Sequence, residues 1–111
     1  MNYSQALAEV EDSEINIRVG ESFGWNAYFI HPDGSVTFRD DKGRLKGKKN
    51  YCHNPADSWP IIQLNRICIT HHSKDWEWHC YAHGLNQNVI NKNPLRAAMI
   101  VFLMMQDANN A

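Results

Sequence analysis

At 111 residues with a formal net charge of −1, the chain is long enough for one domain with a single core and too short for two. Its charge balance differs from the strongly basic one of most DNA-binding domains. Three cysteines, an odd number, speak against a disulfide framework and favour a reducing compartment. The first residues are polar and acidic, and the longest apolar run, 97–105, is far shorter than the roughly 20 residues of a membrane span. We therefore expect a single cytoplasmic domain over residues 1–111, with no membrane partner.

The first third of the chain predicts a helix and then a hairpin. Ser13 is a suitable N-cap, Ile15, Val19 and Phe23 recur at helical spacing, and Gly24 interrupts the pattern, which predicts a helix over 14–22. The stretches 25–31 and 35–39 flank the tetrapeptide PDGS, whose composition is typical of a tight turn. We expect these stretches to pair as antiparallel strands.

The segment 39–50, RDDKGRLKGKKN, concentrates positive charge. It holds six of the eleven Lys and Arg residues and two of the twelve acids, which leaves +4 here and −5 elsewhere. Since it also holds two glycines, we interpret it as a mobile basic loop. Such a run is usually a solvated connector, but it is also a candidate site for an anion: nucleic acid, a nucleotide or an acidic protein. The candidate ligand-binding residues are Arg39, Lys42, Arg44, Lys46, Lys48, Lys49 and Tyr51.

A second helix is predicted over 55–64. Asn54 followed by Pro55 is a typical helix start, because proline at the first helical position loses no hydrogen bond. Pro60 lies close enough to the first turn to be tolerated, with a kink. We expect Trp59, Ile62 and Leu64 to face the core.

Residues 68–80 read CITHHSKDWEWHC, and they predict a second hairpin between 67–72 and 75–82. With a two-residue turn at Ser73–Lys74, Ile69 would lie opposite Trp78 and Cys68 opposite His79. The alternation places Cys68 and Cys80 on opposite faces of this hairpin.

That alternation weighs against metal binding and nucleophilic catalysis. Structural zinc needs four converging ligands, whereas only Cys68, His72 and His79 share a face, although Cys52 and His53 could complete a set. A Cys68–His79 nucleophilic pair would also need an orienting group and a pocket. We expect no catalytic residues, no metal and no cofactor. A metal becomes an open alternative if both faces of the sheet are buried.

The last predicted helix begins at Asn93–Pro94 and continues to about Gln106. It is apolar on all sides, so it must be covered on all sides, by other helices or by a second copy of the chain. A homodimer through this helix is therefore one expectation. The predicted fold is α+β, a small antiparallel sheet of two hairpins packed with three helices in the order α-ββ-α-ββ-α.

Three segments carry a resemblance to a known family: SEINIRVGESFGW at 13–25, YCHNPADSWPIIQLNRI at 51–67 and NPLRAAMIVFLMMQ at 93–106. They resemble the NinX-like family of phage and prophage proteins and, more loosely, the phage alpha-beta-alpha sandwich domains. The resemblance implies a phage or prophage origin and expression inside a bacterial host cell. It supplies no catalytic residues.

Three functions remain open. The first is a non-enzymatic phage accessory protein that binds a host or phage protein. The second is a sponge for a nucleotide-like small molecule of a host defence system, in which the basic segment would hold phosphates and Tyr51, Trp25 or Trp59 would stack on a base. The third is nucleic-acid binding through the basic segment, against which the overall charge speaks.

Overall fold

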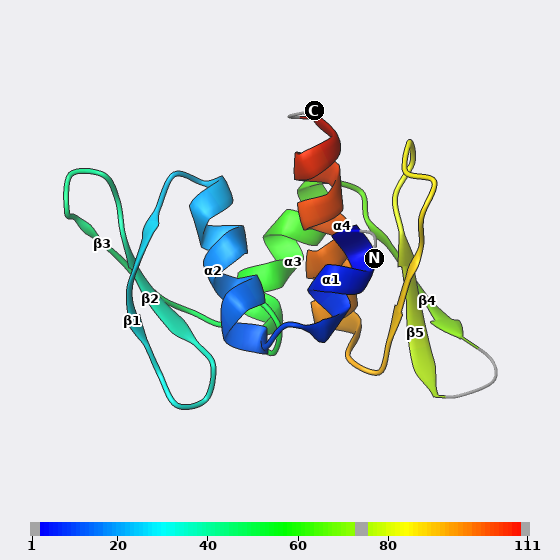
Figure 1. Cartoon of the computed structure of the whole chain (residues 1–111), viewed down its shortest axis with the longest axis horizontal. Coiled ribbons are helices and arrows are strands. Elements are labelled where there is room, and N and C mark those ends of the chain that lie inside the picture. Colours follow the sequence, from blue (N-terminus) through cyan, green and yellow to red (C-terminus); the bar gives the residue numbers. More distant parts are fainter. Residues whose placement is uncertain (1–2, 73–75, 110–111) are drawn as a thin grey trace.

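Helices form the middle layer of the molecule, and a three-stranded antiparallel sheet lies on either side of them (Figure 1). This computed structural model describes residues 3–72 and 76–109, with the backbone alone at 3–5 and 72. The elements in chain order are α1 (Tyr3–Glu9), α2 (Asp12–Ser22), β1 (Asn26–Ile30), β2 (Val36–Arg39), β3 (Leu45–Lys49), α3 (Pro55–Leu64), β4 (Cys68–His72), β5 (Glu77–Tyr81), β6 (Val89–Asn91) and α4 (Pro94–Asn109).

The predicted α+β class is confirmed, with differences in element order and sheet number. Instead of one sheet built from two hairpins, each hairpin gains a third strand and forms its own sheet. Helices separate the two sheets (Figure 1), so the layering is sheet, helices, sheet. This is the reverse of an alpha-beta-alpha sandwich. Helix α1 is an addition to the three predicted helices.

Local capping signals located the starts of two helices correctly. The Asn54 side chain accepts a hydrogen bond from the Ala56 N–H at 3.1 Å, and Asn93 accepts from the N–H groups of Leu95 and Arg96 at 2.9 and 3.2 Å. These bonds satisfy N–H groups that have no partner within the helix. The N-cap of α2 is Glu11, two residues before the predicted Ser13.

The expectation that Trp59 and Leu64 face the core is wrong, because both are exposed. The buried side of α3 consists of Ser58, Ile61 and Ile62, which lie three and four residues apart and therefore share one face. Trp59 and Leu64, which are 55% and 83% exposed, lie outside that buried side.

In the first sheet, the β1–β2 hairpin is confirmed and the segment 39–50 forms its third strand. Asp40 is buried and accepts hydrogen bonds from the N–H groups of Lys42 and Arg44 at 2.9 and 2.8 Å, which closes the turn before β3. Gly47 has a φ of +99°, which few other residues adopt. Residues 45–49 of the expected loop therefore form a strand, because pairing with β2 satisfies their backbone, and residues 40–44 form the turn before it.

In the second sheet, the β4–β5 register differs by two residues from the predicted one. Ile69 pairs with Cys80 rather than Trp78, and Cys68 pairs with Tyr81 rather than His79. A shift of two keeps each side chain on its predicted face. The predicted turn at Ser73–Lys74 lies outside the described residues. The third strand, β6, was not predicted.

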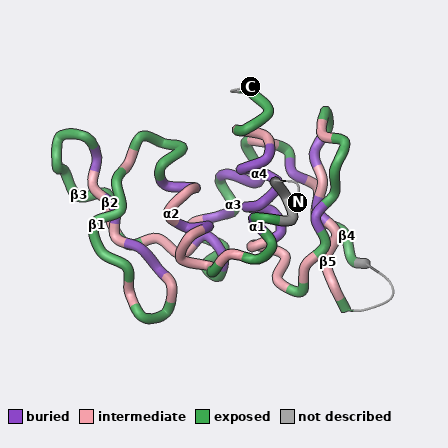
Figure 2. Tube along the Cα trace, in the orientation of Figure 1, coloured by how far each residue is buried: buried purple, intermediate pink, exposed green. Residues whose placement is uncertain are grey.

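Helix α4 is the centre of the core. Its residues from Ala97 to Met104 are all buried (Figure 2), with α1, α2 and α3 on some sides and the second sheet on another. One chain therefore covers this apolar helix, and the argument for a dimer through it loses its premise. The homodimer itself stays a prediction.

Candidate functional site

Carboxylates compensate most of the cations in the basic segment. Arg44 and Lys46 both lie near Asp40, at 2.7 and 3.9 Å. Lys48 lies 4.0 Å from Asp33, and Lys49 lies 4.0 Å from Asp57. Burial raises the pKa of Asp40, but hydrogen bonds from Arg44 and Lys42 outweigh it and hold that pKa below its usual value. The segment therefore presents far less free positive charge than its composition indicates.

Tyr51 differs from the other candidates in being buried. Only 3% of it is exposed, and its ring lies 6.4 Å from that of Phe38. Burial also raises the pKa of its hydroxyl above the usual value. Trp25 packs against Phe38 as well, so both aromatic candidates belong to the core packing, while Trp59 lies apart on α3. The structure does not bring the three predicted stacking residues together around one exposed site.

The first sheet has one buried and one open face. Val36 and Phe38 of β2 are fully buried on the inner face, where Phe38 meets Gly20 of α2. The register places the other side chains in two rows, Phe29 beside Thr37 and Lys48, and Arg39 beside Leu45. We call the face that carries these two rows the outer face. It comprises Tyr28, Phe29, Thr37, Arg39, Leu45 and Lys48.

Tyr28 reaches the outer face through a β-bulge. Pairing between β1 and β2 is irregular between Ala27 and Phe29, so Tyr28 is an extra residue in the strand. A bulge redirects a side chain. Here the Tyr28 ring lies under the Arg39 guanidinium, 3.9 Å from its carbon to the ring centroid. The alternation of a regular strand would have separated Tyr28 from Phe29.

The outer face combines large exposed apolar side chains with one uncompensated cation. Tyr28, Phe29 and Leu45 are 60%, 55% and 66% exposed. Arg39 forms no ion pair within the described residues, and its buried Nε has no hydrogen-bond partner there. Every residue of β1 is exposed (Figure 2), although its four neighbouring apolar and aromatic residues, 27–30, would ordinarily be covered.

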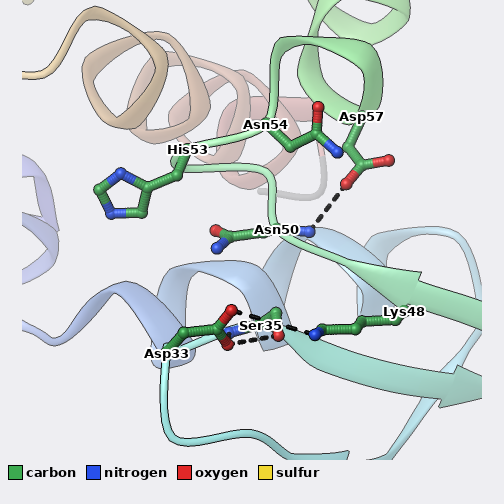
Figure 3. Close-up of a pocket in the computed structure, with 7 residues that line it drawn as sticks. All are labelled: Asp33, Ser35, Lys48, Asn50, His53, Asn54 and Asp57. Atoms are coloured by element: carbon green, nitrogen blue, oxygen red, sulfur yellow. Dashed lines mark hydrogen bonds and ion pairs between the residues drawn. The ribbon is translucent and has the colours of Figure 1, made fainter.

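An open pocket of about 420 Å³ lies between the first sheet and the start of α3. Figure 3 shows Asp33, Ser35 and Lys48 along one wall and residues at the start of α3 along the other; the lining is Asp33, Ser35, Lys48, Asn50, His53, Asn54 and Asp57. Of the predicted ligand-binding residues, only Lys48 lines this pocket. Because two carboxylates share the lining with one lysine, the pocket is not strongly cationic.

Sequence reasoning missed a polar cluster that joins the starts of α2, α3 and α4. Asp12 accepts hydrogen bonds from His53 and from Arg96, each at 2.5 Å. Arg96 also donates to the carbonyls of Leu7, Ala8 and Val10 at the end of α1. Burial raises the pKa of Asp12, but these partners together hold it below its usual value. No sequence signal links Asp12 to Arg96, which lies 84 positions away.

The buried amide of Asn16 joins α2 to the same region. Its Nδ2 donates to the Gly34 carbonyl at 2.9 Å and to Asn50 Oδ1 at 3.2 Å, and its Oδ1 accepts from the Cys52 N–H at 3.2 Å. These three hydrogen bonds satisfy both polar atoms of the Asn16 amide within the protein. The cluster and Asn16 therefore connect elements to one another, and His53 of the cluster also lines the pocket.

The Cys–His hairpin does not assemble the predicted pair. Cys68 lies opposite Tyr81, and Thr70 lies opposite His79. Burial raises the pKa of Cys52 and of Cys80 to about 12, so both thiols are protonated at neutral pH. In the part of the chain that the structure describes, no three His, Cys, Asp or Glu residues are placed to hold a metal. The side chain of His72 lies outside the described residues.

The fold and the outer face define a small α+β protein with two sheets around a helical layer. None of the helices in the described residues has the length and apolar character that a membrane crossing requires. The chain belongs to the family described as Bacteriophage P22, NinX, which matches residues 6–106. The predicted NinX-like family is thereby confirmed. No curated protein and no solved structure matches the chain.

Proposed function

We propose that this phage-family protein is a non-enzymatic accessory protein that binds a host or phage protein through the outer face of its first sheet. The supporting observation is the exposure of Tyr28, Phe29 and Leu45 on one face, with Arg39 between them. Tyrosine, phenylalanine and arginine are enriched in protein interfaces, and tyrosine and arginine often dominate their binding energy. Membership of a phage family supports action in the cytoplasm of a bacterial host.

The absence of catalytic function is part of this proposal. The two buried thiols have raised pKa values, and the register separates Cys68 from His79. On the outer face the Thr37 hydroxyl lies 2.7 Å from His31 Nε2, but within the described residues His31 has no hydrogen bond to a third, orienting group, which nucleophilic catalysis needs. A binding surface is the chemistry that these side chains support best.

Site-specific photocrosslinking tests the surface. A benzophenone amino acid replaces Phe29 in the full-length protein, which is expressed in phage-infected bacteria and irradiated. We expect one discrete adduct, and its partner is then identified and purified. The matched control carries the benzophenone at Trp76, which is 87% exposed near the second sheet. Equal adducts at both positions, or none at Phe29, contradict the proposal.

Binding of the purified partner gives the second readout. Leu45→Lys replaces an apolar side chain on the outer face, and it should weaken binding by about tenfold or more, because interface anchors contribute more than about 1 kcal/mol each. Leu64→Lys is the control, since Leu64 is exposed on α3. Unchanged binding of the Leu45 variant would refute the role of this face.

Capture of a nucleotide-like molecule is the second candidate, and the pocket near Lys48 and His53 supports it. The carboxylates of Asp33 and Asp57 in the same lining disfavour a phosphate there, because like charges repel. A thermal-shift panel of cyclic nucleotides tests this candidate, with Lys48→Gln as the control. A shift that the variant abolishes would place this function first.

A further inference from the structure

We propose that the partner contributes an extended acidic segment, which pairs with the free edge of β1 and places a carboxylate against Arg39. This inference rests on the proposed function and specifies the chemistry of its partner. It follows from the contrast between the two edges of the first sheet and from the unpaired state of Arg39.

The two edges of the first sheet differ in how they are protected. The sheet order is β1-β2-β3, so β1 and β3 are its edges. Strand β3 carries Lys46, Lys48 and Lys49, and charged side chains, lysine above all, keep a natural sheet edge from pairing. Strand β1, NAYFI, carries no charge and is exposed throughout. An open edge of this kind can accept an additional strand.

The backbone of β1 is oriented for such pairing. The His31 N–H donates to the Ser35 carbonyl at 2.9 Å, which makes this a hydrogen-bonded pair. In an antiparallel ladder the neighbouring residue turns its backbone groups to the opposite side. The N–H and C=O of Ile30 therefore face the free edge. The bulge at Tyr28 precedes this stretch, so the N–H and C=O of Ile30 are the groups that this regular part of β1 offers to an added strand.

Arg39 supplies the preference for an acidic segment. Its guanidinium carbon lies over the Tyr28 ring, 3.9 Å from the centroid, and no carboxylate compensates it within the described residues. Its buried Nε also lacks a hydrogen-bond partner there. A buried unpaired donor is costly and calls for an explanation. A carboxylate from a partner strand on β1 would lie beside this charge, where arginine recognises carboxylates well.

Charge also argues against two other occupants of the β1 edge, a second copy of the chain and a nucleic acid. A second copy of the chain would bring two basic sheets together, with Arg39 and Lys42 of each copy repelling those of the other. A nucleic acid needs several free cations along its backbone. Four of the six cations in segment 39–50 already have carboxylate partners. One free arginine beside apolar side chains suits a single carboxylate instead.

A displayed library of random twelve-residue peptides, selected on the full-length protein, tests this inference. We expect the selected peptides to be rich in Asp and Glu and to alternate with apolar residues. Fluorescence anisotropy with the tightest peptide then measures its Kd. Arg39→Gln should weaken binding about 10- to 100-fold, since it removes a charge-assisted hydrogen bond. Lys92→Gln, an exposed change next to β6, should leave the Kd unchanged.

Two substitutions at Ile30 test the added strand itself. Ile30→Pro removes the outward N–H and should cost about tenfold or more in Kd, whereas Ile30→Ala keeps that N–H and should cost less than about fivefold. Because the N–H faces away from β2, the proline should leave the sheet folded, which circular dichroism checks. Equal losses for the two variants would rule out strand pairing.

The inference is overturned if no peptide is selected, if the peptides lack acids, or if Arg39→Gln behaves like Lys92→Gln. Native mass spectrometry showing a dimer that Tyr28→Glu dissociates would assign the edge to a second copy. A labelled twelve-base oligothymidine that binds with a salt dependence of several phosphates would assign it to nucleic acid. The proposed function survives these failures if crosslinking at Phe29 still captures a specific partner.

Discussion

The contact between Gly20 and Phe38 attaches the first sheet to the helical layer, and Gly20→Ala tests how tightly. A Cβ at position 20 would lie 2.2 Å from Cε1 and 2.4 Å from Cζ of the Phe38 ring. That ring is fully buried between Trp25 and Tyr51, so it has little room to move. Alanine would otherwise stabilise the α2 helix by about 1 kcal/mol relative to glycine.

The steric cost should exceed that gain. Overpacking of a core typically costs about 1 to 3 kcal/mol, occasionally more, and a contact this short belongs at the upper end of the range. We expect a net loss of about 2 kcal/mol in the free energy of unfolding. With an unfolding entropy of about 2.1 cal/mol/K per residue, this lowers the melting temperature by about 9 °C.

Urea denaturation and calorimetry of the wild-type and Gly20→Ala proteins measure the effect. Phe38→Leu removes the ring and should be destabilising alone, but the double variant should be more stable than the sum of the two losses indicates. A Gly20→Ala protein as stable as the wild type, or more stable, would refute the reasoning. It would show that the ring can move away at little cost.

Three further outcomes follow from the polar cluster and the thiols. Arg96→Met should destabilise the fold by about 2 kcal/mol in urea titrations, since it leaves Asp12 with His53 as its one remaining partner and the end of α1 without its donor; a loss under about 0.5 kcal/mol would contradict this. Because the folded pKa of Asp12 lies below its ordinary 3.8, its ionised form should stabilise the fold above about pH 4, and that contribution should disappear as the pH falls through the folded pKa. Asp12→Asn should therefore reduce the slope of stability between pH 5 and pH 2, and an unchanged slope would argue against the ion pair. Iodoacetamide at pH 8 should alkylate half-buried Cys68 before buried Cys52 and Cys80, as mass spectrometry of the folded protein can follow; equal rates would contradict the burial.

Much of the candidate site could not be predicted from the sequence. The concentration of cations at 39–50 was visible, but their compensation was not, because Asp33 and Asp57 lie in other elements. The exposure of β1 could not be predicted from the sequence either, since NAYFI has the composition of a buried strand. The position of Tyr28 under Arg39 depends on a bulge, and no residue in β1 signals one.

Segments whose partners lie nearby in the chain were predictable. The helix starts at Asn54 and Asn93 and the β1–β2 hairpin depend on hydrogen bonds and backbone preferences within a few residues. The sequence by itself therefore determined the fold class, most element boundaries and the family.

The tertiary structure decided the rest, because it depends on contacts between distant residues. The end of helix α1 is held by Arg96, some 86 to 89 positions along the chain. Strand β3 forms because β2 offers it backbone partners, even though its lysines and glycine are typical of a loop, and the three-residue β6 forms because β5 offers it partners. Pairing with a neighbouring strand outweighs local propensity here, and so it decides which side chains remain open to a partner.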